Sequence, residues 1–137
     1  MQPDDVLLNK AAIIERCLRR VRAEYEACPE LNDFTHVDAL TLNIERACQA
    51  AIDMAMHRVA VNRLGIPQSA GEAFTLLERA GVIPAEQAKA MRSMIGFRNI
   101  AVHQYQELDH GILAWVATKS EVDFVAFGAA LGVTIRP

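Results

Sequence analysis

The most constraining feature of the sequence is the spacing of its apolar residues. Along nearly the whole chain they recur at intervals of three, four and seven, which places them on one face of an α-helix. The clearest stripe consists of Leu40, Ile44, Ala47, Ala51, Ala55 and Val59. Val, Ile and Thr nowhere form the period-two runs that strands need. We therefore predict an all-α fold.

Capping and turn residues divide this pattern into about five helices. They are predicted to begin near residues 5, 35, 70, 84 and 109, and the last is predicted to end near residue 131. Capping boxes that start at Thr35 and Ser69 mark two of these starts. Gly81 would end the third helix in a left-handed conformation, and Pro84 suits the first position of the fourth. Short loops between such helices favour an up-and-down bundle. In the last helix the expected core residues are Ile112, Trp115, Val116, Phe124 and Phe127.

The length of the chain limits its organisation. A chain of 137 residues suffices for one domain with a real core, so we expect a single domain over residues 1–137. Its apolar fraction of 52% slightly exceeds the usual range of about 45–50%. A small domain often covers such an excess with a partner, and we therefore expect an oligomer.

The charge balance restricts the possible partners. With 14 basic and 17 acidic residues the formal net charge is −3, which excludes a generally basic nucleic-acid binder but permits a small basic groove. Four arginines, Arg16, Arg19, Arg20 and Arg22, cluster in the first predicted helix. They are either a solvated helix face or a patch that contacts RNA.

Cysteine usage and the chain ends indicate the compartment. Cys17, Cys28 and Cys48 show no C-x-x-C spacing, which is typical of a reduced, cytoplasmic protein without structural zinc. Asp4 and Asp5 stand where a signal peptide needs basic residues. The uncharged stretch 124–135 has 12 residues, too few to span a bilayer. We expect a cytoplasmic protein with no membrane segment, metal ion or cofactor.

One short segment, 96–105, carries polar side chains that a scaffold helix does not need. Arg98, Asn99, His103 and Tyr105 fall within eight residues near a helix end. On a continuous helix Asn99 and His103 share a face, whereas Arg98 and His103 lie about 140° apart. A helix that loosens near His103 would bring all four side chains to one groove. The alternative is an ordinary helix end, with His103 near the C-terminal dipole and Tyr105 packed.

These residue types fit the cleavage of a phosphodiester in RNA. The unperturbed pKa of histidine lies near neutrality, so His103 can take or give a proton. Arg98 can hold the non-bridging oxygens and stabilise the charge that grows on the phosphorus. Asn99 can orient the imidazole or the phosphate. The RNA's own 2′-hydroxyl would be the nucleophile, so this reaction requires no metal ion.

The spacing R-x-x-x-x-H-x-Y, formed by Arg98, His103 and Tyr105, resembles the signature of the HEPN superfamily in the form carried by HepT toxins. The resemblance extends over residues 4–127 and includes the flanking segments 42–57, 64–69, 74–77 and 98–108. It implies a homodimeric, metal-independent endoribonuclease toxin with its motifs at the dimer cleft. It also implies a nucleotidyltransferase antitoxin (MntA), which silences the toxin by adding AMP to the motif tyrosine, here Tyr105.

A dimer suits this chemistry because the reaction needs one base and one acid, while the motif supplies one histidine per chain. A two-fold axis places identical patches together, so His103 of each protomer could fill one role.

A rival function is also consistent with the fold: HEPN-like bundles serve as non-catalytic binding or dimerisation subunits beside nucleotidyltransferases. The joint presence of Arg98, His103 and Tyr105 favours the enzyme.

Asp53 and His57 form a second polar pair, four residues apart on the second predicted helix. They are a possible carboxylate–imidazole pair. Asp53 could instead lie under the motif and hold Arg98, in a supporting role. The simplest interpretation is a polar stripe that is partly paired and partly solvated.

Overall fold

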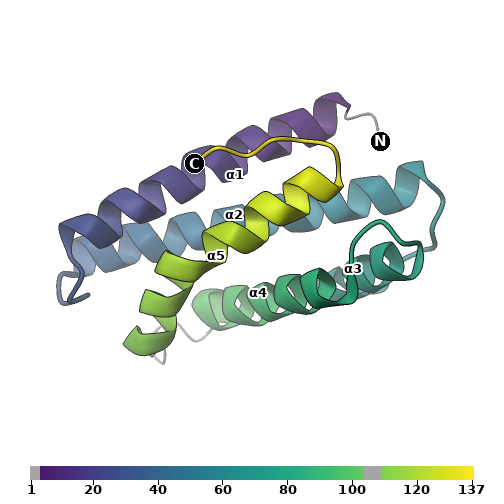
Figure 1. The fold of residues 1–137 in the computed structure, drawn as a ribbon. Helices are drawn as coiled ribbons and strands as arrows, with labels where there is room; N and C mark the ends of the chain where they lie inside the picture. Colours follow the sequence, from purple (N-terminus) through teal and green to yellow (C-terminus); the bar gives the residue numbers. More distant parts are fainter. Residues whose placement is uncertain (1–3, 104–108) are drawn as a thin grey trace.

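The computed structural model describes residues 4–103 and 109–137, which form five helices and no strand. Figure 1 shows the two longest, α1 (Asp5–Ala27) and α2 (Phe34–Val61), as an antiparallel pair. The other three are α3 (Ala70–Arg79), α4 (Ala85–His103) and α5 (His110–Ala130). The predicted all-α fold is confirmed.

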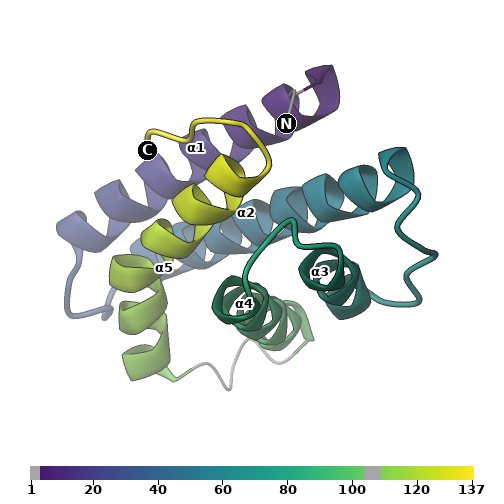
Figure 2. The same cartoon turned by 45° about the vertical axis from the view of Figure 1, so that its right-hand side comes forward.

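Helix α2 lies at the centre of the arrangement. It packs against each of the other four helices, whereas α1 contacts only α2 and α5 among them. Figure 2 shows α1 on one side of α2, α3 and α4 on the other, and α5 crossing the bundle. The central position explains why α2 buries small residues along much of its length: alanine allows neighbouring helices to approach closely from several sides. These alanines are Ala47, Ala50, Ala51 and Ala55.

The helix ends confirm most of the sequence predictions. Ser69 Oγ accepts a hydrogen bond from the Glu72 amide at 3.2 Å and caps α3. Gly81 has a φ of 76°, and the Val82 amide donates to the Leu77 carbonyl at 2.9 Å, as expected for a left-handed helix stop. Pro84 immediately precedes α4 instead of occupying its first position, a shift of one residue.

The start of α2 at Phe34 lies within one residue of the predicted position, but the predicted cap is wrong. Its cap is Asp33, whose side chain accepts from the Thr35 amide at 2.8 Å, and Thr35 itself lies inside the first turn. An aspartate cap carries a negative charge that also interacts favourably with the positive end of the helix dipole. Asp33 is therefore at least as good a cap as the threonine chosen from the capping-box pattern.

Two of the core residues predicted for α5 are also wrong. Ile112 and Trp115 are 52% and 56% exposed. The buried stripe of α5 runs instead through Leu113, Val116, Ser120, Phe124 and Phe127. Phe127 meets Phe74 of α3 edge to face, with the ring centroids 5.3 Å apart.

The C-terminal residues fasten the end of the chain to α1. Val133 and Ile135 are buried, and the Arg136 amide donates to Glu15 Oε1 at 2.8 Å. Gly128 permits this packing, because a Cβ at that position would lie 2.6 Å from Ile135 Cδ1. Figure 1 shows the tail running along α1 after the end of α5.

Ile135→Ala should therefore lower the free energy of unfolding by about 2–5 kcal/mol, because it removes a buried side chain and leaves a cavity. Urea denaturation followed by circular dichroism measures this change. The exposed neighbour Thr134 provides the control, since Thr134→Ala should change stability by no more than about 0.5 kcal/mol. Equal effects of the two substitutions would contradict a packed tail.

Candidate functional site

The last two turns of α4 present the predicted site residues to solvent. Phe97 and Ala101 are buried in the core and fix the rotation of the helix about its axis. Asn99 and His103 are consequently exposed on the outer side, and Arg98 is half-buried at its edge.

The helix remains regular up to His103, so the loosening that would bring the four side chains to one groove does not occur within the described residues. Arg98 and His103 therefore stay about 140° apart around the helix axis. The shared face of Asn99 and His103 is as predicted. Tyr105 lies outside the described residues.

Arg98 reaches across to α2. Its Nη1 donates to Gln49 Oε1 at 3.3 Å, and its Nε is buried with no hydrogen-bond partner among the described residues. The charge of Arg98 also acts on the buried Cys48, where burial raises the pKa of the thiol to about 12 and the positive charge of Arg98 opposes that rise. The Cys48 thiol thus stays protonated, and the Arg98 charge is not neutralised by it.

In the part of the chain that the structure describes, Gln49 links Asp53 to Arg98. Gln49 Nε2 donates to Asp53 Oδ1 at 3.0 Å, and Asp53 Oδ2 pairs with Lys10 Nζ of α1 at 3.0 Å. A chain of contacts therefore runs from α1 across α2 to α4.

The structure shows neither direct contact considered for Asp53. His57 Nε2 lies 2.5 Å from Asp4 Oδ2, so the possible Asp53–His57 pair does not form. Asp53 and His57 instead pair with residues outside α2, which agrees with the simplest interpretation, a partly paired polar stripe. Arg98 is held by the amide of Gln49 and not by the Asp53 carboxylate. Sequence analysis missed Gln49. Its place four residues before Asp53 on the exposed face of α2 was visible, but the sequence did not indicate its contact with α4.

An exposed apolar patch adjoins the motif. An open groove of about 430 Å³ lies between α4 and α5, and Phe97 and Val116 are among its lining residues. Its exposed apolar residues are Ile100, Ile112 and Trp115, which we call the α4–α5 patch. Ile100 lies three residues before His103, so the patch reaches the exposed imidazole.

The described part of the chain offers neither a metal-binding cluster nor a membrane-spanning helix. Within residues 4–103 and 109–137, no three His, Cys, Asp or Glu side chains gather where they could hold a metal ion. None of the helices in this described part is long and apolar enough to cross a membrane.

Comparisons with known proteins agree with one another. Residues 8–130 match the family model described as HepT-like, ribonuclease HepT-like. The chain is 40% identical over 125 residues to the mRNA nuclease HepT of Shewanella oneidensis strain MR-1, a match that covers 90% of this chain and 94% of that protein.

Two solved structures are also similar, each with a TM-score of 0.89 and 38% identity. One is a toxin–antitoxin complex with AMP-PNP, and the other is a tri-AMPylated Shewanella oneidensis HEPN toxin in complex with MNT antitoxin. They cover 93% and 94% of this chain, and 98% of each solved chain is matched.

Proposed function

This chain belongs to the HepT-like ribonuclease family, and we propose that it is the toxin of a toxin–antitoxin pair, a metal-independent endoribonuclease that acts as a homodimer. The observation that carries the proposal is that one regular helix, α4, presents both a guanidinium and an imidazole: Arg98 is anchored to the neutral amide of Gln49, and His103 is exposed. The buried residues of all five helices belong to one core, which supports a single domain. Its three cysteines are free and buried, which fits a cytoplasmic location.

The proposed reaction is a transesterification within the RNA. A base removes the proton of the 2′-hydroxyl, whose oxygen attacks the adjacent phosphorus and displaces the 5′-oxygen of the next nucleotide. An acid protonates that leaving oxygen, and the products are a 2′,3′-cyclic phosphate and a 5′-hydroxyl. His103 supplies base or acid, Arg98 stabilises the charge on the phosphoryl oxygens, and Asn99 orients the phosphate or the imidazole. Gln49 and Asp53 position Arg98.

Two features support the proposed homodimer: the divergence of Arg98 and His103 on their helix, and the exposed apolar residues beside the motif. Because Arg98 and His103 diverge on their helix, a phosphate beside His103 benefits from groups supplied by a second copy. The α4–α5 patch adjoins His103 and exposes Ile112 and Trp115, which a partner would cover. A two-fold axis through this region would place two imidazoles and two guanidinium groups around one cleft.

The partner is proposed to be an MntA-like nucleotidyltransferase antitoxin. The similar HEPN toxin that was solved in complex with an MNT antitoxin is tri-AMPylated. In this chain the proposed acceptor of AMP is Tyr105. Each AMP would add negative charge and a large base near the site, which would repel and block an RNA backbone.

Purified protein should cleave total RNA in the presence of EDTA and leave 2′,3′-cyclic phosphate ends. His103→Ala should lower the rate by about 10²–10⁴-fold, because it removes a general acid–base group. Rates and end groups are read by gel and by end-specific labelling. His110→Ala is the matched control, since His110 is also exposed but lies outside the motif. Cleavage that EDTA abolishes, or that His103→Ala retains in full, would contradict the mechanism.

Refolding wild-type chains together with His103→Ala chains tests the shared site. If both imidazoles are required, an equal mixture should retain about a quarter of the activity of the same total amount of wild-type chains, because random pairing makes that fraction of dimers fully wild-type. A linear dependence on the wild-type fraction would show that each chain works alone.

Tyr105→Phe should remain toxic, or nearly so, when expressed alone, because the proposed reaction does not use the phenol. It should escape the antitoxin, because phenylalanine has no hydroxyl to accept AMP. Growth of cells with and without the co-expressed antitoxin measures both effects. Complete loss of RNA cleavage in this variant would instead assign Tyr105 to the reaction itself.

A further inference from the structure

An arginine-lined groove lies between α1 and α2, apart from the motif. It is open, has a volume of about 520 Å³ and is lined by no acidic residue. Its arginines are Arg16, Arg19, Arg20 and Arg46, and we call this feature the arginine groove. Ile13, Cys17 and Ala23 form its apolar part. The groove thus gathers four arginines in a chain whose formal net charge is −3.

The four guanidinium groups differ in how they are paired. Arg20 Nε donates to Glu24 Oε1 at 2.6 Å, and Arg19 donates to the Arg136 carbonyl at 3.2 Å and lies 3.8 Å from Glu15.

Arg16 and Arg46, in contrast, make no ion pair with any described residue and are exposed. They approach from opposite helices, and both charges act on the buried Cys17 between them: burial raises the pKa of that thiol, and Arg46 and Arg16 oppose the rise. These two guanidinium groups are therefore free to take an external anion.

The exposed face of α2 links the arginine groove to Arg98 of the motif. Arg46 precedes Gln49 by three residues on the exposed face of α2, about 4.5 Å along the helix axis, and Gln49 accepts from Arg98. Figure 2 shows α2 between α1 and α4, so the line from Arg16 through Arg46 to Arg98 crosses three neighbouring helices. Asp53, the acidic residue that contacts Gln49, is itself paired with Lys10, and the hydrogen bond between Arg98 and Gln49 is formed beside that ion pair.

We propose that the arginine groove binds the phosphate backbone of the RNA strand that flanks the scissile link, with Arg16 and Arg46 as its main contacts. The inference rests on the proposed ribonuclease function and extends it to the substrate beyond the reacting phosphate. Guanidinium forks bind phosphate oxygens with two hydrogen bonds, and they read no base, so the groove adds affinity without sequence preference. The unpaired state of Arg16 and Arg46 means that no internal ion pair must break on binding.

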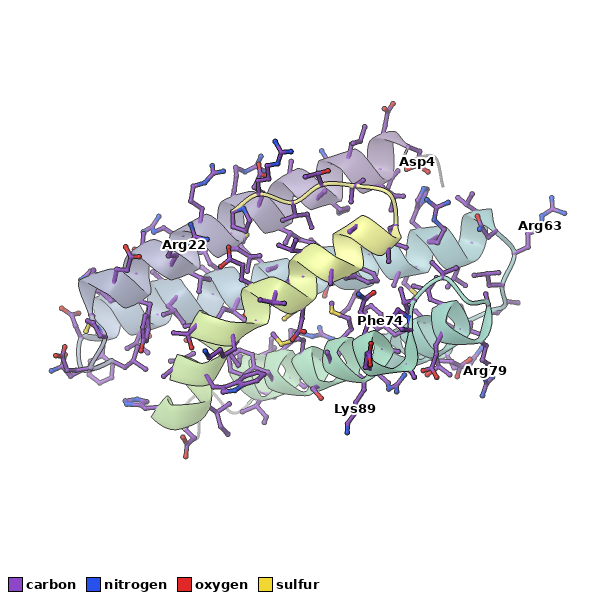
Figure 3. The ribbon with its side chains drawn as sticks, in the orientation of Figure 1. Asp4, Arg22, Arg63, Phe74, Arg79 and Lys89 are labelled. Carbon is purple, nitrogen blue, oxygen red and sulfur yellow. The ribbon has the colours of Figure 1, made fainter. Side chains whose placement is uncertain are left out.

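The test measures RNA affinity in a His103→Ala background, so that the strand is not cut. A single-stranded RNA of about 20 nucleotides should bind the double variant Arg16→Gln/Arg46→Gln at least about tenfold more weakly. The slope of log affinity against log salt should become shallower by about 1.4, because each lost phosphate contact removes about 0.7 for single strands. The matched control is Arg63→Gln/Arg79→Gln, which changes the net charge equally. Figure 3 shows Arg63 and Arg79 away from α1, beyond the end of α2 and on α3.

Cleavage gives a second measurement with catalytically competent chains. The ratio of kcat/KM for the long RNA to that for a trinucleotide should fall about tenfold in the Arg16→Gln/Arg46→Gln variant, since the short substrate does not reach the groove. Thermal melting checks that both variants fold. Unchanged RNA affinity and salt slope would overturn the proposal, as would a loss confined to antitoxin binding, which would make the groove a protein-docking surface. A wild-type protein that cleaves no RNA would overturn the proposed function, whereas the binding titration would still test the groove.

Discussion

The burial of Phe97 and Ala101 in the core is the constraint on which the site depends. These two residues set the rotation of α4, and the positions between and beyond them follow from helical geometry. Arg98 is thereby directed to α2, while Asn99 and His103 face outward. The same rotation leaves Ile100 at the edge of the α4–α5 patch. The packing of one helix thus places both the residues of the proposed chemistry and the proposed dimer contact.

The identity of the residue that anchors Arg98 matters for the charge of the site. A carboxylate in that place would form an ion pair and neutralise much of the guanidinium's attraction for phosphate. Gln49 provides an acceptor without a charge, and the nearest carboxylate in the chain of contacts, Asp53, is compensated by Lys10. Arg98 is in this way positioned while its positive charge remains available.

Sequence patterns predicted the helices well because each depends on local rules: apolar periodicity, the Ser69 cap and the left-handed Gly81. The sequence predictions failed where two local rules competed for the same position, and where contacts between helices determine which residues are buried. Asp33 and Thr35 are both good caps two residues apart, and only backbone geometry separates them. Ile112 and Trp115 are apolar yet exposed, because the stripe through Leu113 and Phe124 is the one that faces the core.

The contact of Gln49 with Arg98 depends on the register between α2 and α4, which no local sequence pattern encodes. The α4–α5 patch and the arginine groove also depend on how helices pack, so the sequence could not predict them.

These two surfaces differ in physical character. The α4–α5 patch is apolar, so its association with another surface would depend weakly on salt. The arginine groove is charged, so its attraction for phosphate would weaken as salt rises. A protein of net charge −3 has no general attraction for RNA, so RNA binding depends on local features, and the proposed ones are Arg16, Arg46 and Arg98.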